Sequence, residues 1–338
     1  MRAVVNERYG SPDVLELREV PAPQPRPNEI QVRVHATTVG RTDACALRAH
    51  PFFIRIGSGL LRPKRKILGL DFAGVVETAG SRVENFRPGD RVFGLTPGGY
   101  GAHAQFVCVP ADGAVAVMPP GTPFAEAVVG EGAWYANTYL ERFGLAPGHR
   151  ILIYGASGAI GTSAVQLSKA RGAVVTAVAP TPHLELARRL GADRVVDYTV
   201  EDFTQLGERY DFVLDAVGKT TYFQCRPLLK PSGVFAATDL GPWWQNIVLS
   251  TWSSLTRSGR VVMPMPISSQ SFVELLRDLI AAGEFQAVID RTYPLSEIAE
   301  AYRFVELAQK AGIVVVEVVP QPEESDSAAS RSSRKHGE

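Results

Sequence analysis

A glycine-rich turn between an apolar run and a helix is the strongest chemical signal in this sequence of 338 residues. Small residues let a backbone approach a pyrophosphate, and the N-terminus of the next helix offers free N–H groups. The spacing is GxxGxxG rather than the commoner GxGxxG, and a plain turn is the alternative. The strand–glycine–helix order within one βαβ unit nevertheless predicts a dinucleotide site. Arg150–Tyr154 leads into Gly155, Ala156, Ser157, Gly158, Ala159, Ile160 and Gly161.

The second strand of this unit bears on which dinucleotide binds. Enzymes that use NAD usually carry Asp or Glu about 20 residues after the glycines, where it holds the ribose hydroxyls. Here no acid occurs between Gly161 and Glu185, and the strand is followed by Thr181 and His183. A carboxylate there would repel a 2′-phosphate. Its absence, together with a hydroxyl and an imidazole, predicts NADPH as the cofactor.

Two stretches of the chain differ in the pattern of secondary structure that their residues predict. Residues 1–122 hold short β-rich runs separated by Pro/Gly clusters, which predicts a small β-barrel or sandwich. Residues 123–289 open with a helix over Pro123–Phe143 and then alternate strands with helices, which indicates an α/β domain with a doubly wound parallel sheet. Ligands bind beyond the carboxyl ends of such strands, so four further residues are expected near the dinucleotide: Tyr198, Ala216, Val217 and Leu240. Residues 320–338 predict a disordered tail.

Composition narrows the class of protein. The net charge is zero, which argues against a nucleic-acid partner because such proteins show a basic bias. Three cysteines far apart, without a Cys/His cluster, indicate neither a disulfide framework nor a structural zinc site. With no apolar signal region and no run of about 18 apolar residues, we expect a cytoplasmic protein without membrane insertion.

Three motifs together resemble the zinc-independent quinone oxidoreductase branch of the medium-chain dehydrogenase/reductase superfamily, and the resemblance runs from Met1 to about Val319. The motifs are LGLDFAGVVETAGSRVENFRPGDRVFG, LAPGHRILIYGASGAIGTSAVQLSK and LGADRVVDY. The resemblance implies a GroES-like β domain over 1–122, completed by about 290–319, and a Rossmann domain over 123–289. It also implies a homodimer that reduces quinones or enones with NADPH in the cleft between the domains.

The same resemblance bears on zinc. Zinc-dependent relatives carry a Cys ligand at the place of Gly40 and a Gly-His-Glu motif where this chain has Gly69-Leu70-Asp71. Glycine and leucine cannot bind a metal, and a catalytic zinc needs three protein ligands. No metal is therefore expected, and Asp71 is expected to be structural.

Without a metal, a hydrogen-bond donor must stabilise the charge that develops on the substrate oxygen. Tyr135 falls where the family usually has a threonine beside the nicotinamide, and it is either that donor or an aromatic core residue. His103 matches a position where several family members carry tyrosine, and it is either a donor or a structural histidine. Tyr198 is implied to approach the 2′-phosphate, and a half-buried tyrosine after a strand is the alternative.

Two other functions remain open at this point. One is a metal-free alcohol dehydrogenase, and the other is a dinucleotide-binding protein with little turnover, because the pair Trp134-Tyr135 could crowd the nicotinamide. The segment Pro242–Leu255 has three tryptophans. It could shape an apolar substrate pocket or touch a membrane, but with no basic face on it we expect packing at the cleft or the dimer interface.

Overall fold

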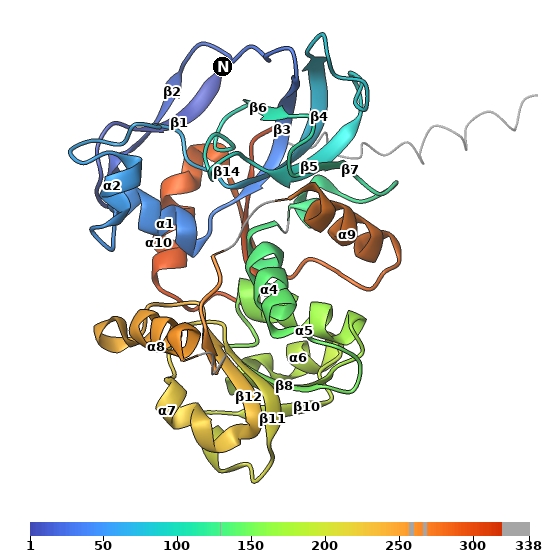
Figure 1. Ribbon diagram of the computed structural model, residues 1–338. Coiled ribbons are helices and arrows are strands. Elements are labelled where there is room, and N and C mark those ends of the chain that lie inside the picture. Colours follow the sequence, from blue (N-terminus) through green and yellow to red (C-terminus); the bar gives the residue numbers. More distant parts are fainter. Residues whose placement is uncertain (129, 257–259, 266–268, 320–338) are drawn as a thin grey trace, which may run out of the picture.

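Two domains lie one above the other, with helix α4 (Gly130–Phe143) between them (Figure 1). The computed structural model describes residues 1–128, 130–256, 260–265 and 269–319. The predicted tail, 320–338, lies outside the described residues. The α/β fold class, a doubly wound parallel sheet beside an N-terminal β domain, is confirmed.

Six parallel strands form the sheet of the Rossmann domain, in the order β10-β9-β8-β11-β12-β13. Counted along the chain this is the order 3-2-1-4-5-6, which is typical of dinucleotide-binding domains. The central strand β8 buries Ile151, Leu152 and Ile153 completely, as expected for a sheet covered on both faces. The strands are β8 (Arg150–Tyr154), β9 (Val174–Ala179), β10 (Arg194–Asp197), β11 (Tyr210–Asp215), β12 (Leu229–Ala237) and β13 (Val261–Val262).

The helices between residues 123 and 289 follow the predicted alternation. The predicted helix over Pro123–Phe143 is divided, because Val128 leaves helical geometry at φ −84° and ψ 65°. The helices are α3 (Phe124–Ala127), α4, α5 (Ala159–Ala170), α6 (Leu184–Arg189), α7 (Tyr222–Cys225), α8 (Gln245–Leu255) and α9 (Gln270–Ala281), with 3-10 turns at Thr181–His183, Phe203–Gln205, Arg226–Leu228 and Pro242–Trp244.

The β domain has a seven-stranded sheet that the end of the chain completes. Its order is β14-β15-β3-β4-β5-β7, and β6 also pairs with β3. The strands are β3 (Glu29–Thr38), β4 (Asp71–Ala79), β5 (Arg91–Leu95), β6 (Phe106–Pro110), β7 (Val115–Val117), β14 (Ile289–Pro294) and β15 (Ile313–Glu317). A separate hairpin, β1 (Arg2–Asn6) and β2 (Leu15–Glu19), the helices α1 (Arg41–Arg48), α2 (Ile54–Ser58) and α10 (Ile298–Glu306), and 3-10 turns at Pro12–Val14 and Leu295–Glu297 surround it.

One hydrophobic cluster links the two domains. It runs from Phe93 and Leu95 in the β domain, through Ala133 and Leu140 on α4, to Ile151 in the Rossmann sheet. Because interiors are close-packed, this shared core fixes α4 relative to both sheets. Polar residues at the start of α4 are thereby held at the domain boundary.

Candidate active site between the two domains

The carboxyl ends of the Rossmann strands meet at one edge of the sheet. Asp215 at the end of β11 pairs with Tyr154 of β8 and with Ala237 of β12. On the other side, Asp197 of β10 pairs with Ala179 of β9. The loops after these strands are therefore neighbours, as the sequence predicted for a ligand site.

Three glycines of the loop have three different structural roles. Gly155 has φ of +77°, a conformation that glycine adopts without strain. A Cβ on Gly161 would lie 2.1 Å from the Gly155 carbonyl oxygen, so this glycine permits close packing of helix on strand. A Cβ on Gly158 would have the Gly155 carbonyl oxygen, at 3.8 Å, as its nearest neighbour in the part of the chain that the structure describes. The loop thus leaves open space at Gly158, where a pyrophosphate would fit.

The end of the chain contacts this loop. The Gly312 amide donates to the Ser157 carbonyl over 2.7 Å, and Gly158 and Gly312 form an isolated parallel bridge. Lys310 donates its ammonium to the Gly312 carbonyl over 2.5 Å. Burial lowers the Lys310 pKa, against the opposing charges of Glu131 and Asp290. The sequence analysis missed this cation, because nothing local ties residue 310 to a loop 150 residues earlier.

At the expected adenosine end of the site, the carboxylate of Asp197 lies beside Thr181, and the sequence analysis did not predict it either. Thr181 donates its hydroxyl to Asp197 over 2.5 Å, and Thr199 donates both its hydroxyl and its amide to the same carboxylate. These hydrogen bonds, the one from Thr181 first, lower the Asp197 pKa, so the carboxylate is charged. Tyr198 is 44% exposed beside it, and the His183 side chain has no hydrogen-bond or ion-pair partner among the described residues. A negative charge therefore stands next to the predicted 2′-phosphate position.

The turn after β11 is held by the buried Asp215. Its carboxylate accepts from the amides of Val217, Gly218 and Thr220 at 2.7–3.0 Å. This fixes the backbone of Ala216 and Val217 against the glycine loop, where a Cβ on Gly155 would lie 2.6 Å from the Val217 side chain. After β12, the carbonyl of Leu240 accepts from the Asn246 amide.

On the β-domain side, Glu131 at the start of α4 reaches across to the first turn of α1. Its carboxylate accepts from the Thr42 amide over 3.1 Å, and its own amide donates to Asp71 over 3.2 Å. A Cβ on Gly40 would lie 1.4 Å from a Glu131 carboxylate oxygen. The space beside Gly40, where the resemblance places a cysteine ligand in zinc-dependent relatives, is therefore filled by the glutamate, and Gly40 and Leu70 do not fit the ligand set of a catalytic zinc.

Two buried carboxyls stand behind Glu131. Asp71 accepts from the amide and hydroxyl of Thr38, and burial, with a smaller contribution from the charge of Glu131, raises its pKa to about 7. Asp43 accepts from the Gly40 and Gly69 amides, and burial raises its pKa well above the ordinary value. Within the described ranges, no group of three or more His, Cys, Asp or Glu side chains is arranged to hold a metal ion.

The two predicted catalytic residues lie in different environments. Tyr135 of α4 lies at the boundary, where the Thr42 hydroxyl of α1 donates to its phenol oxygen over 3.5 Å. Burial raises the Tyr135 pKa, so the phenol stays protonated. His103 has no exposed surface, its Nε2 donates to the Thr38 carbonyl and its Nδ1 accepts from Tyr302. That burial favours the structural alternative for His103 over a role as proton donor to the substrate.

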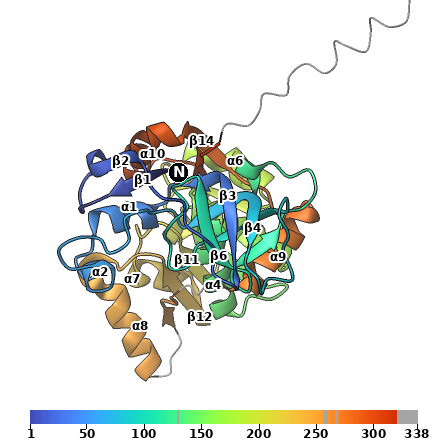
Figure 2. The ribbon, with the colours of Figure 1, turned by 90° about the horizontal axis from the view of Figure 1, so that it is seen from above.

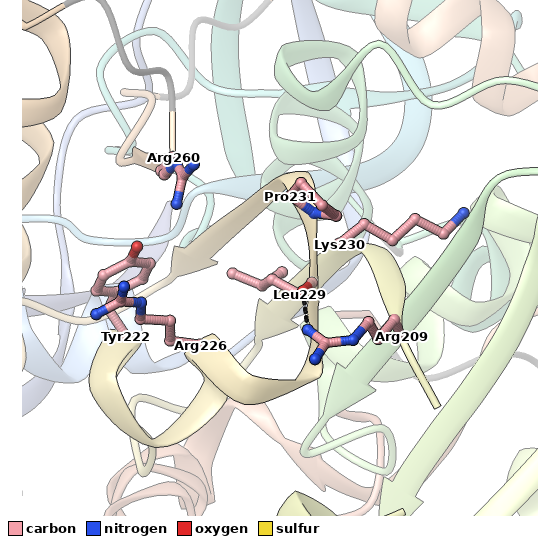
Figure 3. A pocket seen from close by; sticks show the side chains of 8 residues that line it. Arg209, Tyr222, Arg226, Leu229, Lys230, Pro231 and Arg260 are labelled. Atoms are coloured by element: carbon pink, nitrogen blue, oxygen red, sulfur yellow. Dashed lines mark hydrogen bonds between the residues drawn. The ribbon is translucent and has the colours of Figure 1, made fainter. Parts of the chain in front are cut away.

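A pocket of about 160 Å³ lies elsewhere, at the start of β12 (Figure 3). Arg209 donates there to the Leu229 carbonyl, and Lys230 pairs with Asp211. Because Leu229 is at the opposite end of its strand from the loops described above, this pocket has no part in the candidate site.

No helix among the described residues is long and apolar enough to cross a membrane.

Comparison with known families gives two matches. Residues 26–120 match the family described as an alcohol dehydrogenase GroES-like domain. Residues 190–316 match the family described as zinc-binding dehydrogenase. The first match lies in the β domain, and the second covers the later Rossmann strands and the return to the first sheet.

Individual relatives match over nearly the whole chain. A mitochondrial NAD(P)H oxidoreductase of Mus musculus is 32% identical, over 94% of this chain and 89% of its own length. A chloroplastic quinone-oxidoreductase homolog of Spinacia oleracea is 29% identical, over 94% of this chain and 98% of its own. Among solved structures, the quinone oxidoreductase from Coxiella burnetii is 26% identical with a TM-score of 0.83, over 94% of this chain and 99% of that one.

Proposed function

Because the chain belongs to the medium-chain dehydrogenase/reductase superfamily, we propose that it transfers hydride from NADPH to a quinone or an α,β-unsaturated carbonyl without zinc. The observation that carries the proposal is the glycine loop, which is packed tightly at Gly155 and Gly161 and open at Gly158. The names of relatives agree with the reaction class, among them an NADPH-dependent alkenal/one oxidoreductase of Arabidopsis thaliana, 29% identical over 95% of this chain.

The cofactor end of the site is assigned to the loop Gly155–Gly161 and the strand ends around it. The N-terminus of α5 offers free amides to the pyrophosphate. Thr181, His183 and Tyr198 surround the 2′-phosphate in this proposal. The negative charge of Asp197 repels the 2′-phosphate, and this reduces the difference in affinity by which NADPH is preferred to NADH. Three donors already engage that carboxylate, which spreads its charge and leaves the preference for NADPH modest.

At the substrate end, Tyr135 is the donor. Bound NADPH supplies the hydride, and the substrate oxygen then gains negative charge that needs a donor. Thr42 donates to the phenol oxygen of Tyr135, so the phenol's own hydrogen can be donated to the substrate. The raised pKa of Tyr135 keeps this hydrogen in place at neutral pH. Lys310 lies at the glycine loop, where its Nζ donates to the Gly312 carbonyl.

We base the proposal of zinc independence on the residues that occupy the positions of the zinc ligands in zinc-dependent relatives. Gly40 and Leu70 offer no metal-binding atom, and the Glu131 carboxylate fills the space beside Gly40. The Glu131 oxygens already accept from the Thr42 amide, so the glutamate is held by protein donors. Carbonyl polarisation then depends on Tyr135, which favours substrates already activated by conjugation over simple ketones or alcohols.

The test is a panel of enones, quinones and alcohols, each assayed with NADPH and NADH. Turnover of enones or quinones with NADPH supports the proposal. Oxidation of alcohols without added metal would instead identify a metal-free alcohol dehydrogenase. Tight binding of the dinucleotide with no turnover across the panel would identify the low-turnover binding protein, with Trp134 and Tyr135 blocking the site.

A further inference from the structure

Helix α8 buries polar residues and exposes apolar ones, which is the reverse of the pattern of an ordinary surface helix. Its two buried residues are polar, Asn246 and Ser253. Its outer face carries Val248, Trp252 and Leu255, which are 64%, 66% and 76% exposed and follow one another at the i, i+4, i+7 spacing of one helix face. A soluble helix normally shows the reverse pattern, so this face is built to contact something apolar.

The turn before α8 extends the same apolar face. Trp243 is 97% exposed and Trp244 is 52% exposed, and both have positive φ. Three of the four tryptophans of the chain thus lie on this short segment. Tryptophan is the side chain that is enriched where apolar and aqueous phases meet.

A second apolar segment lies in the β domain and is followed by a basic run. Around α2, exposed apolar side chains gather: Phe52, Phe53, Ile56, Leu60 and Leu61. The next residues read Arg62-Pro63-Lys64-Arg65-Lys66, and the whole stretch 52–66 contains no acid. Lys66 pairs with Glu7, whereas no ion pair of Arg62 or Lys64 exists within the described ranges. The run therefore presents net positive charge to solvent.

The two segments form one face that spans both domains. Phe53 and Trp244 meet edge to face, with ring centroids 5.6 Å apart. Figures 1 and 2 both show α2 and α8 on the same side of the molecule. We name this surface the α2–α8 face and define it as residues 52–66 and 242–256. It combines exposed aromatic and aliphatic side chains with cations and has no acidic residue.

We propose that the α2–α8 face docks on an anionic lipid surface. Apolar side chains enter the headgroup boundary and Arg62 and Lys64 bind the headgroup charges, which is how peripheral proteins combine two weak signals. A second copy of the chain fits less well. In a two-fold dimer the same patch meets itself, so these cations would face cations with no acid to pair with. The inference does not depend on the proposed activity.

The test uses the full chain and vesicles without any substrate. Co-sedimentation is measured with phosphatidylcholine vesicles and with vesicles that also contain phosphatidylserine. Tryptophan emission is recorded in parallel, because three of the four indoles lie on the face. Parent protein should bind only the anionic vesicles, with a blue shift, and added salt should release it.

Two variants and a matched control locate the contact. Arg62→Glu/Lys64→Glu should lower binding about 25-fold or more, since each basic residue near such a surface contributes about five-fold. Trp243→Ser/Trp252→Ser should also lose binding. Arg87→Glu/Arg142→Glu removes the same charge outside the face and should bind like the parent. Melting curves and dinucleotide titration establish that each variant is folded.

Three results would overturn the proposal. The parent could fail to bind anionic vesicles, or bind neutral ones equally well. The charge reversal could bind like the control. Finally, gel filtration could show that the tryptophan variant turns an oligomer into a monomer while the parent ignores vesicles, in which case a second copy covers the face.

Discussion

Replacing Gly158 by valine separates cofactor binding from folding. Gly158 has φ of −75° and ψ of 174°, which any residue adopts, so a side chain there brings no backbone strain. A Cβ would lie 3.8 Å from the Gly155 carbonyl oxygen and 3.9 Å from the Val217 side chain, which are ordinary contacts. The free protein therefore accepts the side chain, and only the bound pyrophosphate competes with it for space.

The size of the effect follows from these contacts. Gly158 is the N-cap of α5, and valine is a poorer N-cap, at a cost of up to about 1 kcal/mol. That lowers Tm by about 2–4 °C. Loss of space for the phosphate oxygens should cost at least about 2 kcal/mol of binding, which is roughly 30-fold in NADPH affinity.

Gly161→Ala serves as the contrasting control. Its Cβ would lie 2.1 Å from a backbone oxygen, so we expect about 1–3 kcal/mol of destabilisation and a Tm several degrees lower without cofactor. Affinities are measured by nicotinamide fluorescence titration, and Tm by circular dichroism without cofactor. A Gly158→Val protein that melts normally and binds NADPH like the parent would refute the reasoning, because the loop would then be only a structural turn.

Four further outcomes follow from the site. NADPH should bind more tightly than NADH, and Asp197→Asn should widen the difference by removing a charge beside Thr181; equal affinities in both proteins would contradict this. Purified protein should contain no stoichiometric zinc by elemental analysis, and a chelator should leave activity unchanged. Tyr135→Phe should lower kcat by about 10²-fold or more with little change in NADPH affinity, measured by steady-state kinetics and titration. Asp71, with its pKa raised to about 7 chiefly by burial, and Asp43, raised well above its usual value, favour the fold while protonated. That stabilisation is complete below about pH 4 and is lost as pH rises through about 7, so Tm should fall between about pH 6.5 and 8, above the titration of the buried histidines. A constant or rising Tm across that window would be inconsistent with it.

Most of the fold could be predicted from local patterns in the sequence. The glycine loop and the alternation of strands and helices are encoded in neighbouring residues, and the structure has them where they were predicted. The β-rich runs predicted within residues 1–122 correspond to strands β3–β7. The hairpin β1–β2 and the helices α1 and α2 were missed. Helix α2 has no amphipathic pattern to detect, because apolar side chains also lie on its solvent-exposed side.

The site was less accessible to sequence reasoning, because its charges come together through tertiary contacts. The acid-free end of β9 was identified correctly, but Asp197 reaches Thr181 from the neighbouring strand, and only the register of β9 with β10 reveals it. Glu131 was overlooked for the same reason, since its partner Thr42 is 89 residues away. A charged residue among the small apolar residues that begin α4 is the one signal that could have pointed to it.

The pairing of β15 with β3 has a consequence for biosynthesis. On one side, Ala36 and Thr37 pair with Ala73 and Phe72 of β4, but on the other side Ala36–Thr38 wait for Val315–Glu317, roughly 280 residues later. At about 5–20 residues per second, a ribosome needs roughly 14–56 s to make that interval. The Rossmann strands, in contrast, are all translated between Arg150 and Val262. The domain made first is therefore finished last, and until then the nascent chain carries an open strand edge of the kind that other nascent chains can pair with.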